Sequence, residues 1–367
     1  MTSQTNQPHI HGGAPQHALK RLGIEQSKIL DFSVNVSPMG PPQVIYQNWN
    51  KLSGTIEVYP SVDGEGVADY YIQRFGLNRE NVLPGNGSTE CIYLVPRILG
   101  FKKVAVITPS FHDYERACLV AGADMVEWPL NADSKFAEPD PAQLDTILKQ
   151  VDALMLGNPN NPTGTLFKTE TLLDLAKRNP EKWFLVDEAF LQFLDDYDQR
   201  TLTAPRRLQK NIIVFHSLTK LYDIPGIRLG AAISHSETIA MLKSHKEPWT
   251  VNGIAEKIAQ LLIDTEEYEK SLKSLIKKEQ QRFVNALKHL SGISLYPSPV
   301  NFMLARWEAS NNLDDLLRFL LANGIHIRDC RNFRHLEDNF FRFAILKSTD
   351  NKQLIDLLKA ATSQVFA

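Results

Sequence analysis

Residues 211–220 read NIIVFHSLTK: an apolar, β-branched run is followed at once by two hydroxyl side chains and a lysine. Such runs favour strands, so Asn211–His216 is predicted to be a buried strand. Trp183–Val186 and Ala153–Leu156 are apolar runs of the same kind, and each is also followed by polar residues. In a parallel sheet the polar residues after such strands gather along one edge, where α/β proteins bind their ligands.

The same alternation extends outward from this stretch. Further strands are predicted at Val104–Thr108, Asp124–Pro129 and Arg228–Ser234. Helical spacing of apolar residues predicts helices at Val67–Phe75, Ser88–Leu99, Tyr114–Ala121 and Thr169–Arg178. Pro84–Gly87 is predicted to be a turn. Apolar strands that alternate with helices indicate βαβ units and a parallel sheet buried on both faces.

The pattern changes in the last third of the chain. Asn252–Lys288 is predicted to be one long, charged helical stretch that links two domains. Strands are predicted at Ser294–Arg306, Ile325–Ile327 and Phe340–Ala344, with helices at Leu313–Asn323 and Lys352–Ala361. With 367 residues, more than one core is expected. We therefore predict an N-terminal arm (1–43) with a short helix at Pro15–Leu22, a large domain (44–250), and a linking helix with a small α+β domain (251–367).

Composition excludes several classes of protein. Hydrophobic residues make up 43% and charged residues 22%, which is ordinary for a globular protein. The 40 basic and 42 acidic residues leave a charge of −2, which favours neither nucleic acid nor an anionic membrane as a partner. No apolar run reaches the roughly 18 residues of a membrane span, and residues 1–13 lack a secretory signal pattern. Three scattered cysteines form neither a disulfide framework nor a metal motif, so we expect a cytoplasmic protein without a bound metal.

Taken singly, the polar motifs after the predicted strands have more than one interpretation. Gly85–Glu90 opens a helix, where backbone N–H groups can bind a phosphate, although Ser88 could be only an N-cap. Phe111 could be a core residue or a flat stacking surface. Asp187 could bind magnesium, position a cation or cap a turn. Lys220 could simply reach solvent.

Together and in this order, these motifs resemble the fold-type-I enzymes that use pyridoxal 5′-phosphate (PLP), the aspartate aminotransferase superfamily, over nearly the whole chain. The resemblance implies an α/β large domain with a mostly parallel seven-stranded sheet flanked by helices, plus a smaller α+β domain. It implies that Lys220 holds PLP covalently, that Asp187 keeps the ring nitrogen protonated, that Asn161 donates to the ring O3′ and that Phe111 stacks on the ring. The implied phosphate ligands are Gly87, Ser88, Thr89, Ser217, Thr219 and Arg228. Tyr59 resembles the tyrosine that reaches the neighbouring subunit's cofactor, which implies a homodimer with shared active sites.

Within this superfamily the chain is most similar to threonine-phosphate decarboxylases and next to histidinol-phosphate aminotransferases. The decarboxylase-like features are His11-Gly12-Gly13, Leu30–Asn35, Asp187–Phe190, Pro248–Asn252 and Ile327–Phe333 with Arg342. Aminotransferases usually have tyrosine where Phe190 stands. The resemblance implies that Arg342, with Asn158 or Asn161, binds the substrate α-carboxylate, and that Arg328 and His11 bind its phosphate.

The expected reaction is therefore decarboxylation of O-phospho-L-threonine to aminopropanol phosphate, a step of cobalamin biosynthesis. Three alternatives remain open at this stage: a histidinol-phosphate-type aminotransferase, an O-phospho-L-serine decarboxylase, and an inactive PLP-fold protein that binds an effector. No sequence motif encodes which bond at Cα is broken, because that choice depends on how the substrate carboxylate is held.

Overall fold

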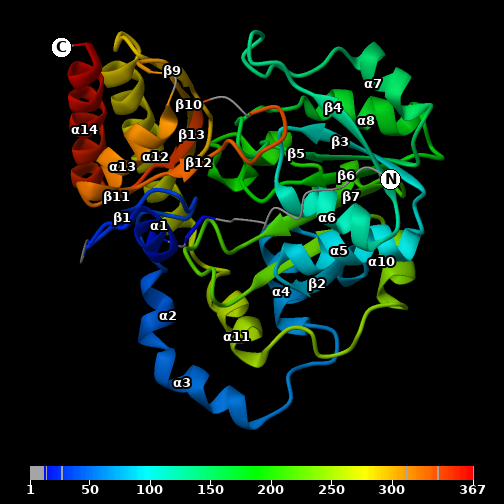
Figure 1. The fold of residues 1–367 in the computed structure, drawn as a ribbon. Coiled ribbons are helices and arrows are strands. Elements are labelled where there is room, and N and C mark those ends of the chain that lie inside the picture. The colour runs from blue at the N-terminus through cyan, green and yellow to red at the C-terminus, as the bar shows by residue number, and fades with distance from the viewer. Residues whose placement is uncertain (1–11, 14, 26–27, 311, 337–338, 367) are drawn as a thin grey trace.

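A seven-stranded sheet forms the centre of the larger part of the molecule (Figure 1). The computed structural model describes residues 12–13, 15–25, 28–310, 312–336 and 339–366. The strand order is β2-β8-β7-β6-β5-β3-β4. All strands run parallel except β8, which is antiparallel to both of its neighbours. The strands are β2 (Val82–Asn86), β3 (Lys103–Thr108), β4 (Asp124–Pro129), β5 (Ala153–Gly157), β6 (Trp183–Asp187), β7 (Ile212–Ser217) and β8 (Leu229–Ile233).

Both faces of this sheet are buried. Successive side chains of a strand point to opposite faces, and Val104 and Val106 of β3 join one core cluster while Ala105 and Ile107 join the other. The helices of this part are α4 (Glu65–Phe75), α5 (Ser88–Leu99), α6 (His112–Val120), α7 (Pro141–Leu148), α8 (Thr169–Arg178), α9 (Tyr197–Arg200), α10 (Ser236–Lys243) and α11 (Gly253–Leu261). The expected mostly parallel sheet flanked by helices is confirmed.

The predicted turn at Pro84–Gly87 is wrong in its first three residues, which belong to β2. Gly85 lies opposite Gly230 of β8. A Cβ on Gly230 would lie 2.4 Å from the backbone nitrogen of Ser88, and one on Gly85 would lie 2.8 Å from Cys91 Sγ. These glycines therefore permit close packing of two strands against α5. Only Gly87, with φ of 76°, has the left-handed backbone typical of a turn.

A four-stranded antiparallel sheet forms the centre of the smaller part, in the order β12-β13-β10-β9. Its strands are β9 (Ile293–Tyr296), β10 (Phe302–Trp307), β12 (Arg328–Asp329) and β13 (Phe340–Ala344). The neighbouring helices are α12 (Glu266–Leu287), α13 (Leu313–Ala322) and α14 (Ser348–Phe366) (Figure 1).

Two predicted elements are divided in the structure. The expected linking helix is two helices, α11 and α12, because the Thr265 hydroxyl donates to the Leu262 carbonyl at 2.6 Å and competes with helical hydrogen bonding there. The expected strand 294–306 is the hairpin β9–β10, because Pro297 and Pro299 lie between its two halves and cannot donate to a sheet.

The N-terminal arm contacts the smaller part through β1 (Leu30–Asp31), which pairs in parallel with β11 (Ile325–His326). The arm also contains α1 (Pro15–Leu22), and α2 (Gln43–Gln47) and α3 (Trp49–Ser53) follow it. Figure 1 shows α2 and α3 projecting away from both sheets. The boundaries predicted at residues 43/44 and 250/251 stay predictions. Across the described ranges, no helix is both long and apolar enough to cross a bilayer, and no cluster of three metal-ligating side chains is present.

Candidate active site

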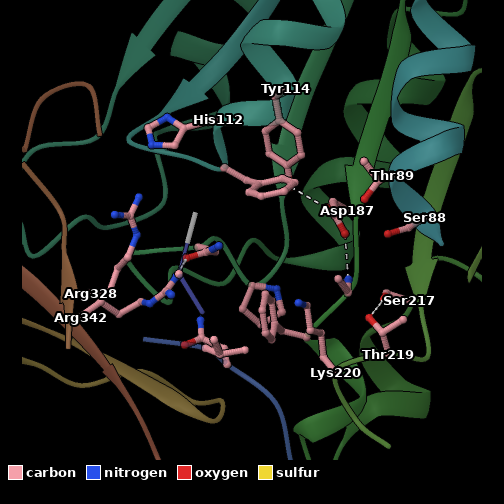
Figure 2. Close-up of a pocket in the computed structure, with 18 of the residues that line it drawn as sticks. Ser88, Thr89, His112, Tyr114, Asp187, Ser217, Thr219, Lys220, Arg328 and Arg342 are labelled. Carbon is pink, nitrogen blue, oxygen red and sulfur yellow. Dashed lines mark hydrogen bonds between the residues drawn. The ribbon is translucent and has the colours of Figure 1, made fainter. Parts of the chain in front are cut away.

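A cavity of about 180 Å³ lies between the carboxyl ends of the central strands and the smaller sheet. A single water molecule needs roughly 10–15 Å³ by the same kind of measure, so the cavity admits an organic molecule rather than an ion alone. Figure 2 shows the polar side chains that converge on it. Predicted residues that line the cavity are Ser88, Thr89, Phe111, Asn161, Asp187, Ser217, Thr219, Lys220, Arg228, Arg328 and Arg342.

Lys220 lies in the loop after β7, with its side chain in the cavity. Burial lowers the pKa of its amine from 10.5 to about 8, and the positive charges of Arg342 and Arg228 add to this effect, whereas Asp187 opposes it. The neutral amine is the nucleophilic form. A lowered pKa therefore makes Lys220 reactive toward an aldehyde near neutral pH.

Asp187 ends β6, and its carboxylate is buried at the cavity wall. Burial raises its pKa from 3.8 to about 6. Two hydrogen bonds to the ionised form oppose that rise: the Tyr114 hydroxyl donates to Asp187 Oδ2 at 2.8 Å, and the Ala189 backbone N–H donates to Oδ1 at 2.9 Å. The carboxylate therefore stays largely ionised at neutral pH and can balance a cationic ring nitrogen.

One end of the cavity gathers groups that favour an anion. Ser88 and Thr89 begin the twelve-residue helix α5, whose first N–H groups and dipole favour an anion. Arg228 Nη2 lies 3.5 Å from Thr89 Oγ1. A Cβ on Gly87 would lie 2.5 Å from Arg228 Nη2 and would displace the guanidinium, and the φ of 76° at this position also favours glycine. The Ser217 and Thr219 hydroxyls, 2.9 Å apart, also line this cavity (Figure 2).

These groups fit pyridoxal 5′-phosphate. The reactive amine, the buried carboxylate and the phosphate-binding helix start line one cavity, and Phe111 lines it as well. The Phe111 ring packs edge-on against Tyr114, with centroids 5.7 Å apart and an interplanar angle of 86°. When bound here, the cofactor would act as an electron sink at the substrate carbon attached to its imine.

Two arginines occupy the side of the cavity formed by the smaller sheet. Arg328 of β12 lies directly opposite Arg342 of β13, and both are buried. Arg342 donates to the Ser33 carbonyl at 2.8 Å and to Asn161 Oδ1. Burial lowers the pKa of Arg342 to about 10, and the charge of Arg328 acts in the same direction. Like charges opposite each other are unfavourable in a sheet, so this pair indicates a site for an anionic ligand.

Not every predicted site residue is brought into this cavity. Asn158 is fully buried, and its amide is hydrogen-bonded to the backbone of Phe167, which makes it a structural residue outside the cavity lining. Tyr59 is 86% exposed and packs on Trp249 with ring centroids 5.6 Å apart, outside the cavity of its own chain. His11 lies outside the described residues.

Several residues of the cavity lining were not among the predicted site residues. Tyr114 and His112 were assigned no role, although both follow the β3 strand end, where the sheet places its ligand-binding loops. Asn35 also lines the cavity, and its Oδ1 is buried with no hydrogen-bond partner among the described residues. Phe190 lines the cavity too, and as a phenylalanine it provides no hydroxyl.

The chain is similar to characterised proteins over nearly its full length. The family profile described as aminotransferase class I and II matches residues 27–358. Threonine-phosphate decarboxylase from Salmonella typhimurium is 31% identical over 358 residues, which covers 95% of each chain. A bifunctional adenosylcobalamin biosynthesis protein from Leptospira interrogans is 27% identical over 94% of this chain and 40% of its own length. The crystal structure of histidinol-phosphate aminotransferase from Clostridium acetobutylicum is 29% identical, with a TM-score of 0.85 over 92% of this chain and all of that chain.

Proposed function

Because the chain belongs to the class I and II aminotransferase family and uses pyridoxal 5′-phosphate, we propose that it decarboxylates O-phospho-L-threonine to aminopropanol phosphate. The observation that carries this proposal is the pair of buried arginines, Arg328 and Arg342, which face each other across two strands at the cavity. A substrate with a carboxylate and a phosphate supplies one anionic group for each guanidinium. The threonine-phosphate decarboxylase of Salmonella supports the same assignment.

The proposed roles follow from where each group lies. Lys220, whose amine lies in the cavity, would hold the cofactor, and the cofactor would supply an electron sink for the substrate. Arg342, held in place by the Ser33 carbonyl and Asn161, would bind the α-carboxylate and fix its orientation. Loss of CO₂ would leave the electron pair of the Cα–carboxylate bond on Cα, where the cofactor would delocalise it until a proton from the protein replaces the carboxylate. Lys220 would deliver that proton, because its amine lies in the same cavity as Arg342 and Asp187 and can act as a general acid.

A histidinol-phosphate-type aminotransferase is the second candidate. The 29% identical histidinol-phosphate aminotransferase structure favours it, and the same cavity would accept a phosphorylated amine. Phe190 weakens it, because this side chain cannot supply the O3′ hydroxyl contact that the aminotransferases usually have.

We also propose that two copies of the chain assemble with shared active sites. Large apolar side chains are exposed from α2 to the segment before α4 and at residue 249: Tyr46, Trp49, Ile56, Val58, Tyr59, Val62 and Trp249. Exposed apolar surface of this extent is typical of a protein interface. A second copy seated here would cover it, and Tyr59, which stands outside its own cavity, would then be free to reach the partner's cofactor phosphate.

The deciding experiment supplies PLP-loaded protein with O-phospho-L-threonine and no keto acid. We expect stoichiometric CO₂ and aminopropanol phosphate. Addition of 2-oxoglutarate should leave the rate unchanged. If product forms only with 2-oxoglutarate and appears as glutamate plus a keto acid, the aminotransferase function replaces the decarboxylase. Competition between phosphothreonine and phosphoserine then ranks the two decarboxylase substrates.

A further inference from the structure

The active-site cavity contains an imidazole side chain to which the proposed mechanism gives no role. His112 is the first residue of α6 and lines the same cavity as Lys220 and Arg328. Figure 2 shows His112 and Arg328 on the side of the cavity away from Ser217 and Thr219, which belong to the cofactor-phosphate end. His112 therefore lies toward the substrate end of the cavity.

The His112 ring is held in place by an aromatic contact. It stacks on Phe333 with ring centroids 4.5 Å apart and an interplanar angle of 26°. The guanidinium carbon of Arg328 lies 5.1 Å from the centre of the same Phe333 ring. Phe333 thus contacts both the His112 imidazole and the Arg328 guanidinium and limits how these two groups can move relative to one another.

This arrangement joins the two parts of the molecule. His112 belongs to α6 of the larger part, whereas Phe333 and Arg328 belong to the smaller part. The residues after Phe333 are ion-paired to the larger part: Arg334 bonds Glu115 of α6 at 3.0 Å and Glu127 of β4 at 2.6 Å, and His335 bonds Glu127 at 2.7 Å. These ion pairs hold the loop against α6, so the His112–Phe333 stack forms when the two parts are in contact.

We propose that His112 is a specificity-determining residue that donates a hydrogen bond to the substrate's distal phosphate, beside Arg328. This inference rests on the proposed function, because it assigns the phosphomonoester of the substrate to this end of the cavity. Arg328 donates through Nη2 to Asn332 Oδ1 at 3.0 Å, which orients the guanidinium. A phosphate has more acceptor positions than one guanidinium fills. A neutral imidazole carries one N–H donor and a protonated imidazole carries two.

Two variants separate hydrogen bonding from packing. His112→Gln keeps a donor and loses the aromatic ring, whereas His112→Phe keeps the stack on Phe333 and loses the donor. His289→Gln, in the exposed turn after α12, is the matched control. The ligands are 3-hydroxypropionate and its phosphate ester, which have no amine and so cannot react with the cofactor. Calorimetry on the PLP-loaded protein measures how much more tightly each variant binds the ester than the free hydroxy acid.

The wild type and the His289→Gln control should prefer the phosphate ester equally. We expect His112→Phe to lose roughly ten- to hundredfold of that preference, which is typical of a lost hydrogen bond to a charged group, and His112→Gln to keep most of it. The opposite ranking, in which His112→Phe keeps the preference for the ester and His112→Gln loses it, would mean that His112 acts only by packing on Phe333 and would overturn the inference. Equal losses for ester and free acid would also overturn the inference. If the wild type prefers the ester but releases no CO₂ from phosphothreonine, the proposed reaction fails while the role of His112 stands.

Discussion

Replacing Tyr114 with phenylalanine should raise the pKa of Asp187 and weaken cofactor binding below a predictable pH. Tyr114 donates to Asp187 Oδ2 at 2.8 Å in a buried site, and Asp187 has a pKa of about 6 with that bond in place. The bond stabilises the ionised carboxylate more than the neutral acid. Its loss therefore favours the neutral acid, which cannot balance a protonated pyridine nitrogen.

The size of the effect follows from the energy of one charged hydrogen bond. Such a bond contributes about 1.5–3 kcal/mol, and one pKa unit corresponds to about 1.4 kcal/mol, so the pKa should rise by about one to two units. At pH 7 the ionised fraction of Asp187 would fall from about nine-tenths to between about a half and a tenth. As the pH is lowered, PLP affinity should thus decline as Asp187 is protonated. The midpoint of this decline should lie near pH 6 in the wild type and about one to two pH units higher in the variant.

The assay is equilibrium binding of PLP to the apo-protein between pH 5 and 9, followed by absorbance. Protonation of unbound PLP affects the binding curves of the wild type and the variant equally. The measured quantity is therefore the difference between their two pH midpoints. Tyr93→Phe is the matched control, because it removes a tyrosine–aspartate hydrogen bond of 2.5 Å to Asp113 outside the cavity lining. A midpoint shift below about half a unit for Tyr114→Phe, or an equal shift for Tyr93→Phe, would refute the reasoning.

Two further predictions follow from the charges and the exposed surface. Arg342→Gln removes a charge that lowers the pKa of Lys220, so borohydride trapping of PLP on Lys220 should move to higher pH. The same variant should also form a larger share of keto acid product than Arg328→Gln does. An unchanged trapping profile and an unchanged product ratio would contradict this prediction. Tyr59→Ala and Lys220→Ala proteins, each inactive alone, should regain about a quarter of wild-type activity when mixed and re-associated, because random pairing makes half of the dimers hybrid with one intact site each; no recovery after verified subunit exchange would place each site within one chain.

The sequence pattern predicted the central sheet well because the signal is local. Each apolar run of four to six residues is long enough for a strand, and the sheet is buried on both faces, so the runs are continuous and easy to identify. The order of motifs after these strands also led to Lys220 and Asp187, which the structure brings into one cavity. The turn predicted at Pro84–Gly87 failed because local turn propensity was outweighed by pairing with β8, which is distant in the sequence.

What the sequence alone determined is therefore the strand-and-helix alternation and the identity of the reactive side chains. Which side chains meet was decided by the tertiary structure. Tyr114 donates a hydrogen bond to the carboxylate of Asp187, 73 positions away. Asn158 does not line the cavity, because both the nitrogen and the oxygen of its amide are hydrogen-bonded to the Phe167 backbone. Arg328 faces Arg342 only through the register of β12 and β13. Periodicity depends on neighbours in the chain, whereas these contacts depend on how separate elements pack, and no local pattern encodes that packing.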